Sequence, residues 1–193
     1  EKYLIESSVG IGNLSAAPWL AIMDKSVTES AREGFYVVFL FSRSAKKLYL
    51  SLGLGATQFE IIYGRSNDCL DKIALAVKDF KLLFKEYIPD ESLDKIDLVE
   101  DDEIFEEQLR GSSRFLVSAY EKGTCFAKAY DPKKLDDEII YKDLNDFIEV
   151  YKSIVNDSRA ENLDILAEKF AEKNTTANTD YSIPEFIPRD KSY

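Results

Sequence analysis

The chain has 193 residues, of which 45% are apolar, and a net charge of −11. This length and apolar content suffice for one domain with a sizeable core, and no apolar run reaches the 18 residues typical of a membrane-spanning helix. Histidine is absent, which excludes histidine metal ligands and histidine-assisted nucleophiles.

The charge is unevenly distributed along the chain. Residues 1–70 carry seven Lys and Arg and seven Asp and Glu, so the surplus of acid lies within residues 71–193. Phosphate contacts require Lys and Arg, so an acidic chain argues against nucleic acid except at the neutral first segment. The two cysteines, Cys69 and Cys125, lack metal-ligand spacing and are expected to be free thiols in a reducing cytoplasm. Glu1 is not a natural first residue and nothing marks a secretion signal, so we expect a segment of a longer chain.

The first third of the chain is expected to be β-structure. Apolar and aromatic runs predict strands over residues 2–8, 18–23, 35–42 and 47–52. A Gly-, Asn-, Ser- and Ala-rich loop spans 10–17, a polar connection spans 25–33, and a short hairpin loop joins the last two strands.

One long helix is expected after these strands, over residues 66–87. Ser66 or Asn67 can cap its start, and Pro89 stops it. Its apolar residues recur at three- and four-residue steps, which predicts a face packed against the sheet.

The acidic part of the chain is expected to mix strands and helices. Residues 99–108 carry a run of acids typical of a solvated face. We expect a hairpin of strands 114–120 and 124–130, followed by helices over 143–155 and 160–172. The pattern predicts an α+β fold with a curved, mostly antiparallel or mixed sheet flanked by helices. A single domain is expected over 1–173, with a polar, Pro-containing arm or linker over 174–193.

The most informative motif is Gly10-Ile11-Gly12-Asn13, followed by Pro18-Trp19 at the start of a strand. Glycine permits a positive φ or a close approach to a partner, and proline suits the first residue of a strand. Trp19 is the only tryptophan. Held beside a Gly-rich loop, it suits the wall of a site for a flat ligand such as a nucleobase; the alternative is a core residue beneath a tight turn.

Further motifs follow at regular intervals, Gly-x-Tyr-x-Val-x-Leu from Gly34 and Leu-x-Leu-x-x-Gly from Leu48. In this order, the motifs of residues 7–55 resemble the N-terminal recognition domain of McrB-type modification-dependent restriction enzymes. The resemblance points to the same α+β fold. It also implies that the domain binds DNA carrying a modified cytosine and flips the modified base into a pocket.

The resemblance also implies roles for individual residues. Ile11 takes the position of the wedge that fills the gap in the base stack, while Trp19 and Leu40 take those of pocket walls. A third, aromatic wall is expected from the region near residues 109–120, and Tyr120 or Phe115 are the candidates. For Leu40, ordinary sheet core is the alternative.

DNA contact is expected through two loops. The first loop comprises Gly10, Ile11, Gly12 and Asn13, in which Asn13 orders the loop, contacts phosphate or is a plain turn residue. The second is the hairpin with the phosphate-contacting residues Arg43, Lys46 and Lys47. Arg32 and Arg65 would extend the same basic surface.

The implied partners are modified double-stranded DNA, a GTPase domain in the full-length protein and a McrC-like nuclease subunit. A membrane is not expected as a partner. We expect no catalytic residue, metal ion or cofactor in this segment, because it lacks a P-loop motif and a dinucleotide fingerprint. Two alternatives remain open. The acidity favours a protein-interaction domain that has lost DNA binding. The Asp-x-Lys sequence Asp131-Pro132-Lys133 is found in metal-dependent nucleases, although Pro132 would interrupt the strand it needs.

Overall fold

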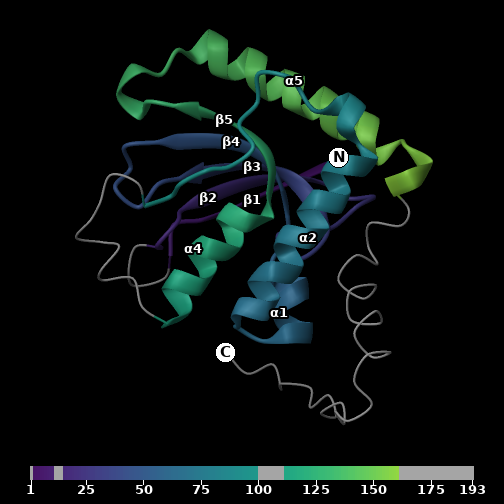
Figure 1. The fold of residues 1–193 in the computed structure, drawn as a ribbon. Helices are drawn as coiled ribbons and strands as arrows, with labels where there is room; N and C mark the ends of the chain where they lie inside the picture. The colour runs from purple at the N-terminus through teal and green to yellow at the C-terminus, as the bar shows by residue number, and fades with distance from the viewer. Residues whose placement is uncertain (1, 11–14, 100–110, 161–193) are drawn as a thin grey trace, which may run out of the picture.

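The fold centres on a five-stranded sheet (Figure 1), in a computed structural model that describes residues 2–10, 15–99 and 111–160. In chain order the strands are β1 (Tyr3–Ser8), β2 (Trp19–Asp24), β3 (Phe35–Phe41), β4 (Leu48–Leu54) and β5 (Thr124–Tyr130). They lie in that same order across the sheet, and each neighbouring pair is antiparallel. The predicted sheet is confirmed, and the first four strands begin and end within two residues of their expected positions.

Helices occupy the long connection between β4 and β5 and the stretch after β5. They are α1 (Thr57–Tyr63), α2 (Asn67–Leu83), α4 (Gly111–Gly123) and α5 (Asp137–Val155), with single 3-10 turns η1 (Lys85–Tyr87) and η2 (Pro132–Lys134). The expected α+β class is therefore confirmed.

Capping residues explain where the two longest helices begin. Ser66, one of the two caps that the sequence predicts, accepts a hydrogen bond through its hydroxyl from the Cys69 N–H at 3.1 Å. The Asp136 carboxylate accepts from the N–H groups of Glu138 and Ile139 at 3.0 and 3.1 Å. Because this cap lies upstream of the apolar stripe, α5 starts six residues before the expected position 143.

One face of the sheet, here called the closed face, packs against α2 and α5. Its core is rich in aromatic rings that are at most 2% exposed: Phe35, Phe80, Phe126, Phe147 and Tyr151. The Tyr151 hydroxyl accepts from the Asp24 N–H and donates to the Phe35 carbonyl, both at 3.0 Å. This one hydroxyl thereby ties α5 to the backbones of β2 and β3.

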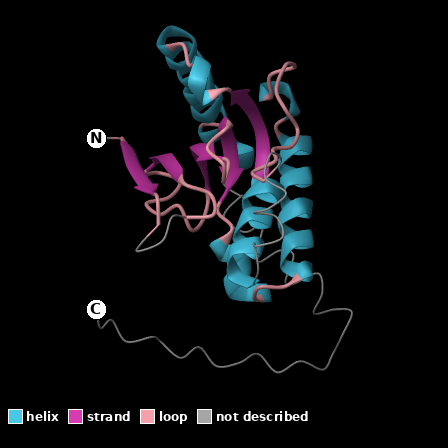
Figure 2. Cartoon of the chain, turned by 90° about the vertical axis from the view of Figure 1, so that its left-hand side faces the viewer, coloured by secondary structure: helices cyan, strands magenta, loops and turns pink. Residues whose placement is uncertain are grey.

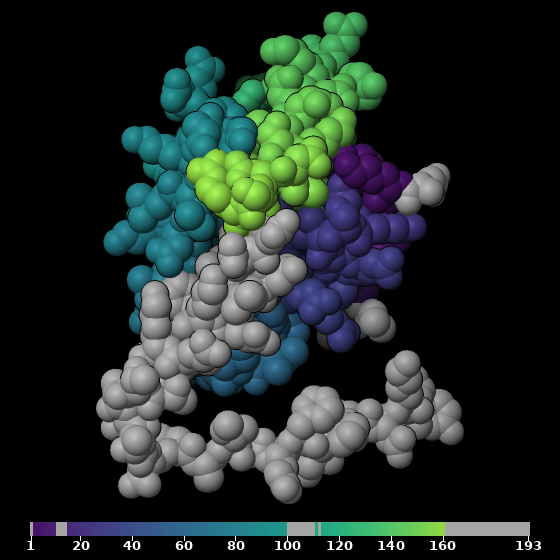
Figure 3. All heavy atoms as spheres, turned by 90° about the vertical axis from the view of Figure 1, so that its right-hand side faces the viewer, coloured from purple at the N-terminus to yellow at the C-terminus, as the bar shows by residue number. Residues whose placement is uncertain are grey.

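The C-terminal end of α5 is fastened to the chain that follows α2 (Figure 3). Arg159 forms an ion pair with Glu86 and donates to the Leu83 carbonyl. The Tyr87 hydroxyl donates to Asp157 at 3.0 Å. These contacts attach the end of the described chain to the C-terminal end of α2 and to η1, on the closed face.

The opposite face, here called the open face, has less helical cover. Side chains alternate along a strand, so Tyr36, Val38 and Leu40 of β3 point to this face while Phe35 and Val37 point to the other. The main helix contacts with the sheet go to β3, β4 and β5. In Figure 2 loops rather than helices flank the N-terminal edge of the sheet.

The expected strand 114–120 is wrong, because these residues belong to α4. Phe115, Leu116 and Val117 form a short apolar run, which fits a strand and a buried helix equally well. The strand over 124–130 is confirmed as β5, but its partner is β4 rather than the segment before it. The acid run from 100, the expected helix 160–172 and the arm 174–193 lie outside the described residues, apart from Ala160.

Candidate functional site

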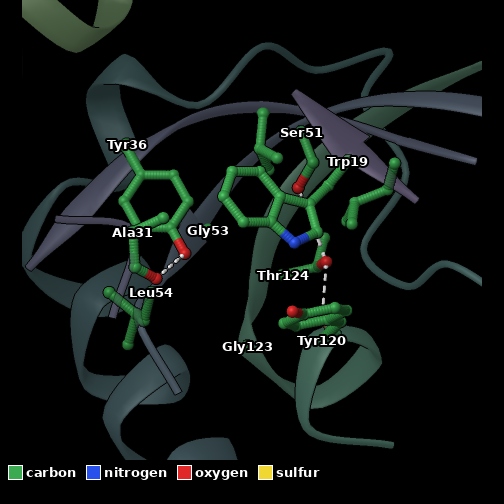
Figure 4. A pocket seen from close by; sticks show the side chains of 11 residues that line it. Trp19, Ala31, Tyr36, Ser51, Gly53, Leu54, Tyr120, Gly123 and Thr124 are labelled. Atoms are coloured by element: carbon green, nitrogen blue, oxygen red, sulfur yellow. Dashed lines mark hydrogen bonds between the residues drawn. The ribbon is translucent and has the colours of Figure 1, made fainter. Parts of the chain in front are cut away.

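A cavity opens on the open face of the sheet (Figure 4). Its empty volume is about 370 Å³, with the open mouth included. The lining residues come from the sheet, from α4 and from the connection between β2 and β3. Trp19, Leu40 and Tyr120, the three residues expected as pocket walls, all line this cavity.

The register of the strands places Trp19 beside Leu40. The two residues are directly paired across β2 and β3, so their side chains lie on the same face of the sheet. Pro18, which has no N–H, extends this ladder through its carbonyl, which accepts from the Phe41 N–H at 2.9 Å. Leu40 is 4% exposed, whereas Trp19 is half-buried.

Tyr120 reaches the cavity from the last turn of α4. The Thr124 hydroxyl donates to the Tyr120 carbonyl at 3.0 Å, which fixes the junction between α4 and β5. Burial raises the pKa of Tyr120, and a hydrogen bond with the Trp19 side chain partly offsets this shift. The tyrosine and tryptophan side chains therefore face each other across the cavity.

The floor of the cavity contains polar groups that the sequence analysis missed. Ser51 and Thr124 are 0% and 2% exposed, and both line the cavity. Here the pairing of β4 with β5 shifts register after Leu52, so Cys125 has no residue opposite it. The available signal was Ser51 itself, a hydroxyl in a wholly buried strand of leucine, tyrosine and glycine.

A second, wider hollow continues from the cavity. It shares Trp19, Ala31 and Tyr120 with the cavity and has an empty volume of about 1040 Å³. Phe115, the other candidate for the third wall, lines this outer groove and not the cavity. Arg32, Glu6 and Glu60 all line the groove, so charges of both signs border it.

The strand ends that flank the two predicted DNA-contacting loops lie at one end of the sheet. The loop after β1 returns to Trp19, and the hairpin with Arg43, Lys46 and Lys47 follows β3 next to it. Gly10 has a φ of 101°, as a glycine turn requires, and the Ser15 N–H donates to the Val9 carbonyl at 2.8 Å. Ile11, Gly12 and Asn13 lie outside the described residues.

The expected basic surface is divided into two groups. Arg43, Lys46 and Lys47 lie at the end of β3, whereas Arg32 precedes its start and Arg65 follows α1. Arg65 forms an ion pair with Glu60, which reduces its net charge contribution. The cavity, which runs from Trp19 to Leu54, lies between the two groups.

The family model of the MrcB-like, N-terminal domain matches residues 1–156. The chain belongs to this family. The match confirms the resemblance to McrB-type enzymes and extends it from residues 7–55 through the end of α5. A search of curated proteins found no match to this MrcB-like domain.

The Asp-x-Lys sequence of the MrcB-like domain forms a local turn. The Asp131 carboxylate accepts from the Lys133 N–H at 2.9 Å and caps η2. Within residues 2–10, 15–99 and 111–160, no three Cys, Asp or Glu side chains are grouped to hold a metal ion. In the same ranges no helix combines the length and apolar content needed to cross a bilayer. Cys69 and Cys125 are buried free thiols, and burial raises the pKa of Cys69 to about 11.

Proposed function

We propose that this MrcB-like domain binds double-stranded DNA carrying a modified cytosine and accepts the modified base, flipped out of the duplex, into the cavity. One observation carries the proposal. Trp19, Leu40 and Tyr120 come from three different elements, β2, β3 and α4, and converge on a single cavity. Enzymes and readers that act on a flipped base hold it between aromatic and apolar walls, and such stacking is available to any base.

The cavity is too small to hold a base without rearrangement. Its volume without the open mouth is about 30 Å³, which has room for a water molecule or two and is far below the roughly 300–1,000 Å³ typical of ligand pockets. The side chains of Trp19 and Tyr120 both border this space and face each other (Figure 4). Insertion of a base therefore requires these two side chains to separate, so that each ring can contact one side of the base.

The loops around the cavity support an approach of DNA from the end of the sheet near Trp19. The strand ends on either side of the glycine loop, Ser8 and Trp19, lie at the same end of the sheet as the hairpin with Arg43, Lys46 and Lys47. Both belong to the neutral first segment, where phosphate meets less repulsion than over the acidic remainder. In this proposal Ile11 is the wedge that replaces the flipped base in the stack.

We assign the domain a recognition role without a catalytic step of its own. On this account it delivers a modified site to a GTPase domain and a McrC-like nuclease subunit. Binding in the full assembly then depends on several linked domains, so a modest affinity of this domain alone is sufficient.

The proposal is tested by equilibrium binding of one duplex with and without a single 5-methylcytosine, at low and moderate salt. The domain is expected to bind the modified duplex more tightly. Tyr120→Leu is expected to abolish the difference, whereas Phe115→Leu, which alters the outer groove on the same helix, leaves most of it.

Equal affinity of the unaltered domain for both duplexes contradicts the proposal. Binding to neither duplex favours instead the protein-interaction domain that the net charge of −11 suggests.

A further inference from the structure

We infer that the hydroxyl groups of Ser51 and Thr124 form a hydrogen-bonding floor that recognises the exocyclic amino group of an inserted cytosine and so discriminates cytosine from thymine. This inference rests on the proposed function, because it requires a base in the cavity. It assigns a property that Trp19, Leu40 and Tyr120 do not supply, since stacking walls accept any base.

Both hydroxyl groups are buried and directed toward the cavity. Ser51 is 0% exposed and Thr124 is 2% exposed. In Figure 4 the Ser51 oxygen points from β4 toward the indole of Trp19, and the Thr124 oxygen lies near Trp19 and Tyr120. A buried hydroxyl without a good partner destabilises the folded state, so a serine in an otherwise apolar strand indicates a role that alanine would not fulfil.

The hydrogen bonds within the floor leave acceptors facing the ligand. Thr124 donates its hydrogen to the Tyr120 carbonyl at 3.0 Å, and Ser51 donates to the Thr124 oxygen at 3.5 Å. Both hydrogens are thus directed to other atoms of the chain. The Ser51 oxygen retains its two lone pairs, so the floor favours a hydrogen-bond donor on the ligand.

Cytosine and thymine differ in the group that such a floor reads. 5-Methylcytosine and thymine share the ring size and the methyl group. At the neighbouring ring carbon, cytosine carries an amino donor where thymine carries a carbonyl acceptor. An amino group donates to the Ser51 oxygen while Ser51 keeps its hydrogen bond to Thr124. A carbonyl can be paired only if the Ser51 hydrogen turns away from Thr124, which breaks that hydrogen bond.

The test compares two duplexes of one sequence, with 5-methylcytosine or thymine opposite the same guanine. The unaltered domain is expected to bind the 5-methylcytosine duplex more tightly. Ser51→Ala should reduce the affinity ratio of the two duplexes by about three- to tenfold, the usual range for one neutral hydrogen bond. The mismatched thymine flips more easily, but this advantage is common to both proteins and cancels when their ratios are compared.

Three further variants separate recognition from folding. Thr124→Val removes the oxygen that orients Ser51 and should also lower the ratio, whereas Thr124→Ser keeps the hydroxyl and should restore it. Tyr36→Phe is the matched control, because its hydroxyl also lines the cavity but donates to the Ala31 carbonyl at 2.7 Å. Thermal melting shows whether each protein is folded.

A second probe changes the base instead of the protein. A duplex with 5-methyl-2-pyrimidinone lacks the amino group, and its affinity relative to 5-methylcytosine should be about three- to tenfold lower in the unaltered domain than in folded Ser51→Ala, in which the partner is already absent. The weaker pair with guanine flips more easily in both proteins, so this effect cancels when their ratios are compared. Suppose that Ser51→Ala keeps the full affinity ratio of the 5-methylcytosine and thymine duplexes while the unaltered domain prefers modified DNA. Recognition of the amino group by Ser51 and Thr124 is then wrong, and the proposed function stands. If the unaltered domain shows no such preference, the proposed function itself fails.

Discussion

The two faces of the sheet differ in how they are packed: one forms a filled core and the other borders a cavity. On the closed face, large rings at most 2% exposed fill the space between sheet and helices, and the Tyr151 hydroxyl has both a donor and an acceptor partner. On the open face, Trp19 and Tyr120 are half-buried beside an empty volume, and the Ser51 hydroxyl has a partner only at 3.5 Å. A face that is packed and satisfied stabilises the fold, and a face left open with unused hydrogen-bonding capacity is available to a ligand.

The largest expected effect is on stability, from a truncation on the closed face. Phe80 is fully buried against Phe35 and Phe84, with ring centroids 5.7 and 4.9 Å away. Phe80→Ala should lower the free energy of unfolding by about 3–5 kcal/mol, because it leaves a cavity in a close-packed core. Chemical denaturation measures this loss. The molecules that remain folded should keep their preference for modified DNA, and a lost preference would show that the two faces are not separable.

The matching change on the open face should act on binding. Trp19→Ala is expected to weaken binding of a modified duplex by about tenfold or more, since stacking on one base contributes about 1–3 kcal/mol. Its cost in unfolding free energy should be smaller than that of Phe80→Ala, because Trp19 is half-buried beside empty space. A drop in stability as large as that of Phe80→Ala would identify Trp19 as a core residue instead.

Charge removal near the open face should change the salt dependence of binding. Lys46→Ala with Lys47→Ala should reduce the slope of log affinity against log salt by about one unit for each phosphate group that the hairpin no longer neutralises. The control pair Lys78→Ala and Lys142→Ala removes the same charge from α2 and α5, which cover the closed face. If both pairs change the slope equally, or if the hairpin pair leaves it unchanged, the hairpin is not the DNA-contacting surface.

The smallest expected effect is a pH dependence on the closed face. Burial raises the pKa of Asp143, but hydrogen bonds from Lys128 at 2.6 Å and Tyr130 at 2.9 Å outweigh it and hold the pKa below its ordinary 3.8. A carboxyl whose pKa is lowered by folding stabilises the protein above its unfolded pKa and loses this contribution as the pH falls through the folded pKa. Asp143→Asn should therefore be less stable than the unaltered domain at neutral pH, and the gap should close at acid pH below 3.8. Urea unfolding at a series of pH values measures the gap, and a gap that persists in acid contradicts the assignment.

The parts of the molecule that were predictable are those set by local pattern. Alternating and buried apolar runs predicted β1 to β4, and the Ser66 cap predicted the start of α2. The segment with Phe115 and Val117 fits a strand by its sequence, because a short apolar run does not distinguish the two periods. Packing of the amphipathic segment against α2 makes it a helix in the fold.

The site was predictable only as far as single residues carry a signal. Trp19 and Leu40, which line the cavity, were expected from motifs that resemble the family, and Tyr120 was one of two aromatic candidates on the segment that forms α4. Ser51 and Thr124 were missed because they meet only through the register shift between β4 and β5, a long-range feature. The gap of more than 70 residues between them leaves no local pattern to read.

The central claim, that a modified base inserts between Trp19 and Tyr120, is tested most directly by the fluorescence of Trp19, the chain's only tryptophan. Titration with a duplex carrying one 5-methylcytosine should quench and shift its emission over the same concentrations at which binding is measured, because a stacked base replaces solvent against the indole. The unmodified duplex should cause little change at those concentrations. Tight binding of the modified duplex without any change in Trp19 emission would contradict the claim.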